Sequence, residues 1–242
     1  MKICTPNLGI LELHISYRCN LRCNNCSNLC TQAPATFDLT VEDIKKLLAD
    51  SLACGRKWGM ITIHGGEPTV HPQYYQICET LLAYKKEHNP DMVLWFLTNY
   101  STDIIKERAN KIKELGIPLG LAPKKDKNQN PNGSWIPYVP VNESPIDLGA
   151  EFTLGCFQTE TCGIAYNYLG FFECSPAASA ARVFGYDSPV KEVKDLTAEK
   201  LSACFPEHCK HCGFAMPDRR RVTEQVTTAT WEKKLGEYNG KI

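Results

Sequence analysis

The chain has 242 residues, and 27 Lys and Arg face 27 Asp and Glu, so its formal net charge is 0 at pH 7. Hydrophobic residues make up 43% of the sequence, enough for a sizeable core, which excludes an intrinsically disordered chain. The charge balance argues against a general nucleic-acid surface, and no apolar run approaches the roughly 18 residues that cross a bilayer. The segment Met1–Asn7 lacks the apolar stretch of a signal peptide. We therefore expect a cytoplasmic protein with no membrane segment and no nucleic-acid partner.

The unusual feature of the composition is its 13 cysteines. A reducing compartment disfavours structural disulfides, and an odd number cannot pair completely, so grouped cysteines in such a chain indicate metal binding. One group lies near the start of the chain: Cys19, Cys23 and Cys26. A second group lies near its end: Cys156, Cys162, Cys174, Cys204, Cys209 and Cys212. The remaining cysteines are predicted to be small buried hydrophobic residues: Cys4, Cys30, Cys54 and Cys78.

The first half of the chain alternates strand and helix patterns. Strands are expected at 11–17, 60–64, 92–97 and 117–121. A first helix is expected between Thr40, the predicted N-cap, and Gly55; a second is expected after Pro72 and a third over 103–115. The continuous apolar run at 92–97 is typical of a strand that a parallel sheet buries on both faces. This spacing predicts βα units, and therefore an α/β fold built on a parallel sheet or a partial barrel.

The pattern changes in the second half. Residues 124–140 are polar and rich in Asn, Pro and Lys, which predicts a long loop or lid, with one possible strand at 135–139. Residues 165–174 are predicted to form a small hairpin that turns at Gly170. We place a domain boundary near residue 150, giving a first domain over 1–150 and a small cysteine-rich domain over 151–242.

The first cysteine group has the spacing C-x3-C-x2-C and lies directly after the first expected strand. Three closely spaced thiolates can hold three irons of a [4Fe-4S] cube, whereas a purely structural cluster takes four cysteines. The arrangement therefore leaves one iron open to a small molecule.

The second motif, His64-Gly65-Gly66-Glu67-Pro68, follows the second strand. The glycines Gly65 and Gly66 let the backbone approach a ligand closely, and Glu67 offers an acceptor to an ammonium group. Alone, a Gly-Gly pair indicates only a turn. The two motifs follow neighbouring strands, so we expect both at the same end of the sheet.

These two motifs resemble the radical S-adenosylmethionine (SAM) enzymes, and the resemblance covers about residues 10–121. It implies that Cys19, Cys23 and Cys26 hold a [4Fe-4S] cluster that binds SAM, and that the segment from Gly65 to Pro68 meets the amino group of SAM. An electron from the cluster then cleaves SAM to methionine and a 5′-deoxyadenosyl radical, which takes a hydrogen atom from substrate. Thr98 and Asn99 resemble the polar pair that the family carries after its third strand. The chain departs from the family at Asn25, where an aromatic residue commonly packs near adenine, and its barrel is short.

The second cysteine group resembles the twitch extension of the same family, which carries an auxiliary [4Fe-4S] cluster. The resemblance implies four ligands, Cys162, Cys174, Cys209 and Cys212, with Gly170 in the hairpin before the second of them. Cys156 and Cys204 remain as possible replacements. A zinc site needs the same four thiolates, and His208 and His211 are additional candidate zinc ligands, so the metal stays open.

The expected function is therefore reductive cleavage of SAM and hydrogen abstraction from a small polar metabolite, such as a sugar, or from a peptide, leading to oxidation, epimerisation or bond formation. A flavodoxin or ferredoxin is the expected electron donor. The alternative is a non-enzymatic protein in which zinc or an iron–sulfur cluster only holds the fold. The substrate and the oligomeric state are left open by the sequence.

Overall fold

The computed structural model describes residues 3–35, 37–122, 151–215 and 227–241 and is built on one six-stranded sheet. The strands are β1 (Ile10–Ser16), β2 (Met60–Gly65), β3 (Val93–Thr98), β4 (Leu119–Leu121), β5 (Ile164–Asn167) and β6 (Gly170–Phe172). Their order is β4-β3-β2-β1-β5-β6. All neighbours are parallel except β5 and β6, which form an antiparallel hairpin. The predicted α/β fold with a mainly parallel sheet is confirmed.

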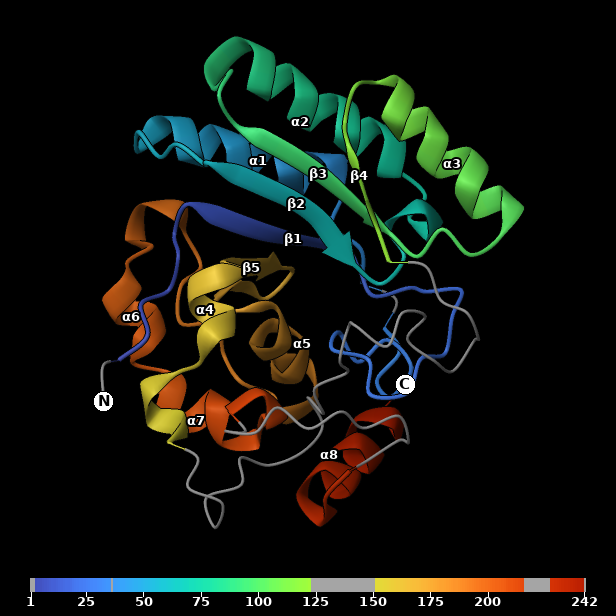
Figure 1. Cartoon of the computed structure of the whole chain (residues 1–242). Helices are drawn as coiled ribbons and strands as arrows, with labels where there is room; N and C mark the ends of the chain where they lie inside the picture. The colour runs from blue at the N-terminus through green and yellow to red at the C-terminus, as the bar shows by residue number, and fades with distance from the viewer. Residues whose placement is uncertain (1–2, 36, 123–150, 216–226, 242) are drawn as a thin grey trace.

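Three helices cover one face of this sheet (Figure 1). They are α1 (Val41–Ala53), α2 (Tyr74–His88) and α3 (Asp103–Glu114). Thr40 caps α1 as predicted, because its hydroxyl accepts a hydrogen bond from the Asp43 amide while the Asp43 carboxylate accepts one from the Thr40 amide. Alternation along β1 points Leu11, Leu13 and Ile15 into the core under these helices, where all three are 0% exposed.

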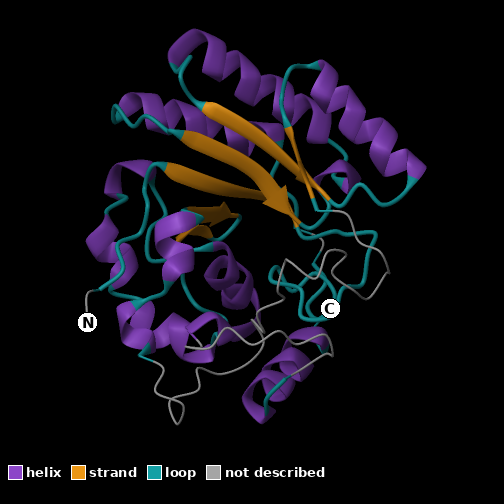
Figure 2. Cartoon of the chain, viewed as in Figure 1, coloured by secondary structure: helices purple, strands orange, loops and turns teal. Residues whose placement is uncertain are grey.

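The opposite face of β1 is covered by the second half of the chain. Helix α5 (Ser175–Phe184) lies against it, and small side chains of α5 pack on Ala165 of β5 and Phe172 of β6. Further helices follow below the sheet: α4 (Phe157–Thr161), α6 (Ala198–Ser202), α7 (Phe205–His208) and α8 (Ala229–Asn239). Figure 2 shows that helices flank the strands on both sides.

Two local predictions are wrong. Strand β3 is not buried on both faces, since Val93 is 39% and Trp95 43% exposed, because the described helices cover only the opposite side of that strand. The hairpin turns at Tyr168 and Leu169 rather than at Gly170, which is already paired with Asn167 as the first residue of β6. Helix α5 was not predicted at all, although Pro176 in its first turn and Gly185 as a left-handed C-cap mark both of its ends.

The sheet runs across the boundary expected near residue 150, because β5 pairs in parallel with β1. The predicted lid at 124–140 and the strand at 135–139 lie outside the described residues. Among the lone cysteines, Cys30 and Cys78 are buried as predicted, whereas Cys4 is half-buried and Cys54, which caps the C-terminus of α1, is exposed. No helix in the described part of the chain has the length and apolar character to cross a membrane.

Candidate functional site

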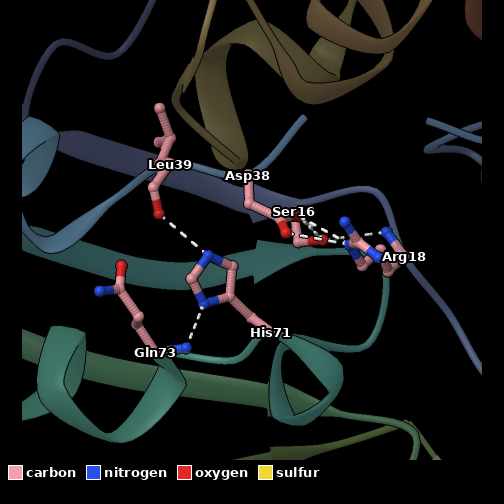
Figure 3. A network of polar contacts seen from close by, with 6 residues as sticks. All are labelled: Ser16, Arg18, Asp38, Leu39, His71 and Gln73. Carbon is pink, nitrogen blue, oxygen red and sulfur yellow. Dashed lines mark hydrogen bonds and ion pairs between the residues drawn. The ribbon is translucent and has the colours of Figure 1, made fainter. Parts of the chain in front are cut away.

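The loop that carries the first cysteine group is closed at its base (Figure 3). Asp38, which forms an isolated β-bridge with Ser16 where the loop returns, accepts a hydrogen bond from the Ser16 hydroxyl at 2.6 Å and pairs with the Arg18 guanidinium at 2.9 Å. The Ser16 hydroxyl also accepts a hydrogen bond from the Arg18 amide at 3.0 Å. These contacts tie the two ends of the cysteine loop together where β1 ends.

His71 joins this base to the segment that follows β2. Its Nε2 lies 2.9 Å from the Leu39 carbonyl, and its Nδ1 accepts a hydrogen bond from the Gln73 amide at 2.9 Å (Figure 3). An imidazole that donates from Nε2 and accepts at Nδ1 is neutral. Burial lowers the pKa of His71, which keeps the ring in that state.

Cys19, Cys23 and Cys26 are all half-buried in this loop. Burial raises the pKa of the Cys19 thiol to about 12, and the neighbouring Cys26 and Cys23 thiols add to the effect. Within the described residues, no three His, Cys, Asp or Glu side chains form a group that could hold a single metal ion. A [4Fe-4S] cube makes a different demand, because each thiolate binds a different iron. Three neighbouring thiols on one short loop fit that demand.

The two glycines after β2 serve the chain's own packing. A Cβ on Gly65, whose φ is +117°, would lie 2.1 Å from the Ser16 carbonyl oxygen, and one on Gly66 would lie 2.1 Å from that of Arg18. The close approach is needed because the Gly66 and Glu67 amides donate to the Ser16 and Arg18 carbonyls at 2.8 and 2.9 Å. The glycines therefore fix the second motif directly against the start of the cysteine loop.

Glu67 is 0% exposed and gathers hydrogen bonds from two strand ends. Its Oε1 accepts from the Thr69 amide at 3.2 Å and the Thr69 hydroxyl at 2.8 Å. Its Oε2 accepts from the Asn99 amide at 2.7 Å, and the Thr98 hydroxyl lies within 3.1 Å of both oxygens. Burial raises the pKa of Glu67 while these donors oppose the shift. The carboxylate expected to meet an ammonium group thus also joins β2 to β3.

Asn99 completes the link back to the cysteines. Its side-chain amide donates to Asn20 Oδ1 at 2.8 Å and lies 4.0 Å from the Cys19 sulfur. Pro68 begins the short 3-10 helix that Glu67 caps. The predicted residues of the cysteine loop, the Gly-Gly-Glu-Pro segment and the Thr98-Asn99 pair are therefore brought together at the carboxyl ends of β1, β2 and β3. Asn25 is 2% exposed and holds a left-handed φ of 47°, which Asn tolerates better than an aromatic residue does.

A buried polar network beneath this site was missed by the sequence analysis. His14, on the inner face of β1, lies 2.9 Å from the Tyr17 hydroxyl and 2.7 Å from the Ser175 hydroxyl of α5. Ser175 donates to Asn28 at 3.0 Å, and the Asn28 amide lies 3.3 Å from His64 Nε2. Burial lowers the pKa of His64 to about 4, so this ring is neutral near pH 7. The polar residues Glu12, His14 and Ser16 alternate with apolar residues along β1, and this alternation was the signal in the sequence that could have predicted a polar network on one face of the strand.

The second cysteine group is brought together differently from the prediction. One cavity is lined by Cys156, Cys174, Cys209 and Cys212. Cys162 does not line it: Cys156 caps the start of the short helix α4 and Cys162 its end, where the Cys162 thiol donates to Gln158 Oε1 at 2.7 Å. Burial raises the pKa of Cys156 to about 11 and that of Cys212 to about 12. Cys204 also lies outside the lining of the cavity.

A buried ion pair borders the same cavity. Glu173 is 0% exposed, and its carboxylate lies 2.9 Å from His208 Nδ1. Burial disfavours the charged His208 ring, but the Glu173 carboxylate outweighs it and the pKa of His208 is raised. His208 bonds Glu173 through Nδ1, whereas His211 lies outside the lining of the cavity.

The fold and the site define an α/β protein that presents a three-cysteine loop at the carboxyl ends of a parallel sheet. Residues 13–122 match the model of the Radical SAM superfamily. The chain is 26% identical over 155 residues to the Fe-coproporphyrin III synthase of Methanosarcina barkeri (strain Fusaro / DSM 804), which covers 60% of this chain and 37% of that protein. The chain thus spans little more than a third of this relative's length.

Among solved structures, BtrN in complex with AdoMet and 2-DOIA resembles this fold with a TM-score of 0.57 at 13% identity, over 92% of this chain and 98% of that one. The structure of anSMEcpe with bound AdoMet and Cp18Cys peptide aligns over 96% of each chain, with a TM-score of 0.46 and 12% identity. The segment 13–122, which carries the three-cysteine loop and the Gly-Gly-Glu-Pro motif, is thus similar to the radical SAM superfamily. The predicted resemblance to this superfamily is confirmed over residues 13–122, and the predicted α/β fold class is confirmed as well.

Proposed function

We propose that the chain cleaves SAM reductively at a [4Fe-4S] cluster held by Cys19, Cys23 and Cys26, and that the resulting radical abstracts hydrogen from a small polar metabolite or a peptide. The observation that carries this proposal is the convergence of the cysteine loop, Glu67 and Asn99 at three adjacent strand ends. The cluster, when bound, supplies the electron that cleaves SAM to methionine and a 5′-deoxyadenosyl radical. BtrN, which shares the fold, was solved with AdoMet and 2-DOIA, and this supports SAM and a small molecule as ligands.

The chain's own residues hold and shield this site. Gly65 and Gly66 keep the second motif in contact with the cysteine loop, and Glu67 fixes the position of Asn99 beside Cys19. Gly65, Gly66, Glu67, Pro68, Thr98 and Asn99 form the proposed pocket for the methionine part of SAM, with Asn25 on its adenine side. His14 contacts Ser175 of α5 on one face of the sheet, and His64 lies against His14. Burial lowers the pKa of both rings, which keeps them neutral. A site built this way orients substrate and excludes water, while the cofactors carry the bond-breaking chemistry.

We propose further that Cys156, Cys174, Cys209 and Cys212 hold the auxiliary [4Fe-4S] cluster. Four cysteine thiolates are the usual ligand set of such a cluster, and these four share one cavity. This set replaces Cys162 by Cys156. The residues 151–242 that carry it form the proposed auxiliary domain, although its hairpin extends the main sheet.

The test is anaerobic reconstitution with iron and sulfide, followed by product analysis with dithionite and SAM. We expect about eight irons per chain, as two [4Fe-4S] cubes require, and formation of 5′-deoxyadenosine. Cys23→Ser should abolish 5′-deoxyadenosine, and Cys78→Ser, which changes a buried cysteine of the core, is the matched control. A colourless zinc-loaded protein that makes no 5′-deoxyadenosine would refute the proposal. One cluster together with zinc in the second site would refute only the auxiliary cluster.

A further inference from the structure

A groove of about 330 Å³ lies between α8 and the segment that follows the first cysteine group. Its lining includes aromatic side chains, Phe37, Tyr168 and Tyr238, and cationic side chains, Arg182, Lys234 and Lys241. The wall formed by α8 is fixed to the cysteine loop. The Tyr238 hydroxyl donates to the Pro34 carbonyl at 3.2 Å, and Asn239 donates to the Gln32 carbonyl at 3.1 Å. The groove is therefore a built feature of the cysteine loop's outer side.

An aromatic pair connects this groove to the cysteines. Phe37 is 60% exposed and stacks on Tyr168, with ring centroids 4.7 Å apart and an interplanar angle of 25°. Tyr168 in turn packs against the apolar cluster of Tyr17, Cys30 and Ala35, to which Cys19 and Cys26 also belong as partly buried members. Tyr168 of the groove and two of the thiols proposed to hold the SAM-binding cluster thus pack against the same apolar cluster.

The groove is also positively charged. Lys234, Lys241 and Arg182 line it together with one carboxylate, that of Glu237, which pairs with Lys234 at 3.0 Å. The described partners of the Arg182 guanidinium are two backbone carbonyls, the Tyr238 hydroxyl and the face of the Tyr17 ring at 3.6 Å, so no described carboxylate cancels its charge. Such a surface attracts a partner with acidic groups and accelerates its encounter.

We propose that this groove is the docking site of an acidic electron-carrier protein that reduces the cluster held by Cys19, Cys23 and Cys26. The inference rests on the proposed function, which consumes one electron for each SAM cleaved. In the transfer, the reduced carrier loses one electron and becomes oxidised by one unit, and the cluster gains that electron. Phe37 offers an exposed aromatic contact, its partner Tyr168 packs against the apolar cluster that Cys19 and Cys26 also contact, and the cations orient the acidic carrier in the groove.

The test uses reconstituted enzyme and a reduced flavodoxin as the probe, with two readouts that do not depend on turnover. The first is the flavodoxin dissociation constant, and the second is the rate of bleaching of the cluster absorbance by flavodoxin or by dithionite. In K234E/K241E we expect flavodoxin affinity to fall roughly tenfold or more, since two favourable charge pairs become repulsive. Phe37→Ala should slow the flavodoxin-driven bleaching. Dithionite-driven bleaching should stay unchanged in both variants.

The control is K86E/K113E, which reverses two exposed lysines on α2 and α3, on the other side of the sheet from α8 (Figure 1). Unchanged flavodoxin affinity in K234E/K241E, or an equal loss in the control, would overturn the proposal. A groove that instead receives substrate would show a raised KM for substrate with unchanged flavodoxin binding, and this result also overturns it. If dithionite-driven SAM cleavage fails in the wild type, the proposed function is wrong, while the binding measurement still decides whether the groove docks the carrier.

Discussion

Glu67 is predicted to be as important for stability as for SAM binding. Its two carboxylate oxygens accept hydrogen bonds from two backbone amides, those of Thr69 and Asn99. Glu67→Gln replaces one acceptor oxygen by a donor, which leaves one buried amide unsatisfied at a cost of about 1–3 kcal/mol. Glu67→Ala removes both acceptors, so its cost is about 2–6 kcal/mol. These are large fractions of the roughly 5–15 kcal/mol that separates native from unfolded states.

The assay is thermal unfolding of the reconstituted enzyme under anaerobic conditions, with SAM affinity measured by equilibrium dialysis. For a chain of this size, Glu67→Gln should lower Tm by roughly 2–12 °C, since each 1 kcal/mol shifts Tm by roughly 2–4 °C. SAM affinity should fall as well, because the substitution weakens the set of hydrogen bonds by which Glu67 holds Asn99 beside Cys19. Glu79→Ala, an exposed substitution on α2, is the control. An unchanged Tm would refute the bridging role of Glu67, and an unchanged SAM affinity would remove Glu67 from the proposed pocket.

Three further outcomes follow from the described contacts. Cys156→Ser should reduce iron from about eight to about four per chain, as expected for loss of one cube, whereas Cys162→Ser should leave it unchanged; the reverse result would restore the ligand set expected from the sequence. Glu12→Gln should remove a pH-dependent loss of stability. Burial raises the pKa of Glu12 from 4.5 to about 8, so between these values the folded state holds a proton that the unfolded state releases. The stability of the wild type should therefore fall relative to that of the variant as pH rises from 4.5 to about 8. Melting curves at about pH 6 and about pH 8 that stay parallel for wild type and variant would contradict this. Asp38→Ala should open the base of the cysteine loop, lower Tm by roughly 2–4 °C for the loss of about 1 kcal/mol, and speed iron release to a chelator; equal release rates would contradict the role of the base.

The first half of the fold was predictable because burial there follows a simple period. The buried residues Leu11, Leu13 and Ile15 occupy alternate positions of β1, and the residue types of Thr40 and Asp43 predict the capped start of α1. Parallel strands place their carboxyl ends at one edge, so two loop motifs in the sequence were enough to predict a shared site. The apolar pattern could not predict that side chains on one face of β3 are exposed, because their burial depends on which other segments pack against that face.

The rest of the site depends on contacts between distant residues, which sequence patterns do not encode. The residue type of Glu67 predicts an acceptor, but its donors at Thr98 and Asn99 lie more than thirty positions along the chain. Spacing alone could not decide between Cys156 and Cys162 as a ligand of the second site, because the choice depends on which end of α4 faces the cavity.

Helix α5 makes the two cysteine groups mechanically dependent on each other. Cys174 is its N-cap and lines the second cavity, while the next residue, Ser175, donates to Asn28 in the loop of the first group. At the other end of the helix, Arg182 donates to the Asn28 and Ala33 carbonyls of that same loop. A change at Cys174 that shifts α5 therefore reaches, through hydrogen bonds, the loop proposed to hold the SAM-binding cluster, even without any electron transfer between the sites. For this reason, loss of turnover in a second-group variant indicates an auxiliary electron-transfer role only when iron at the first site and uncoupled SAM cleavage are both retained.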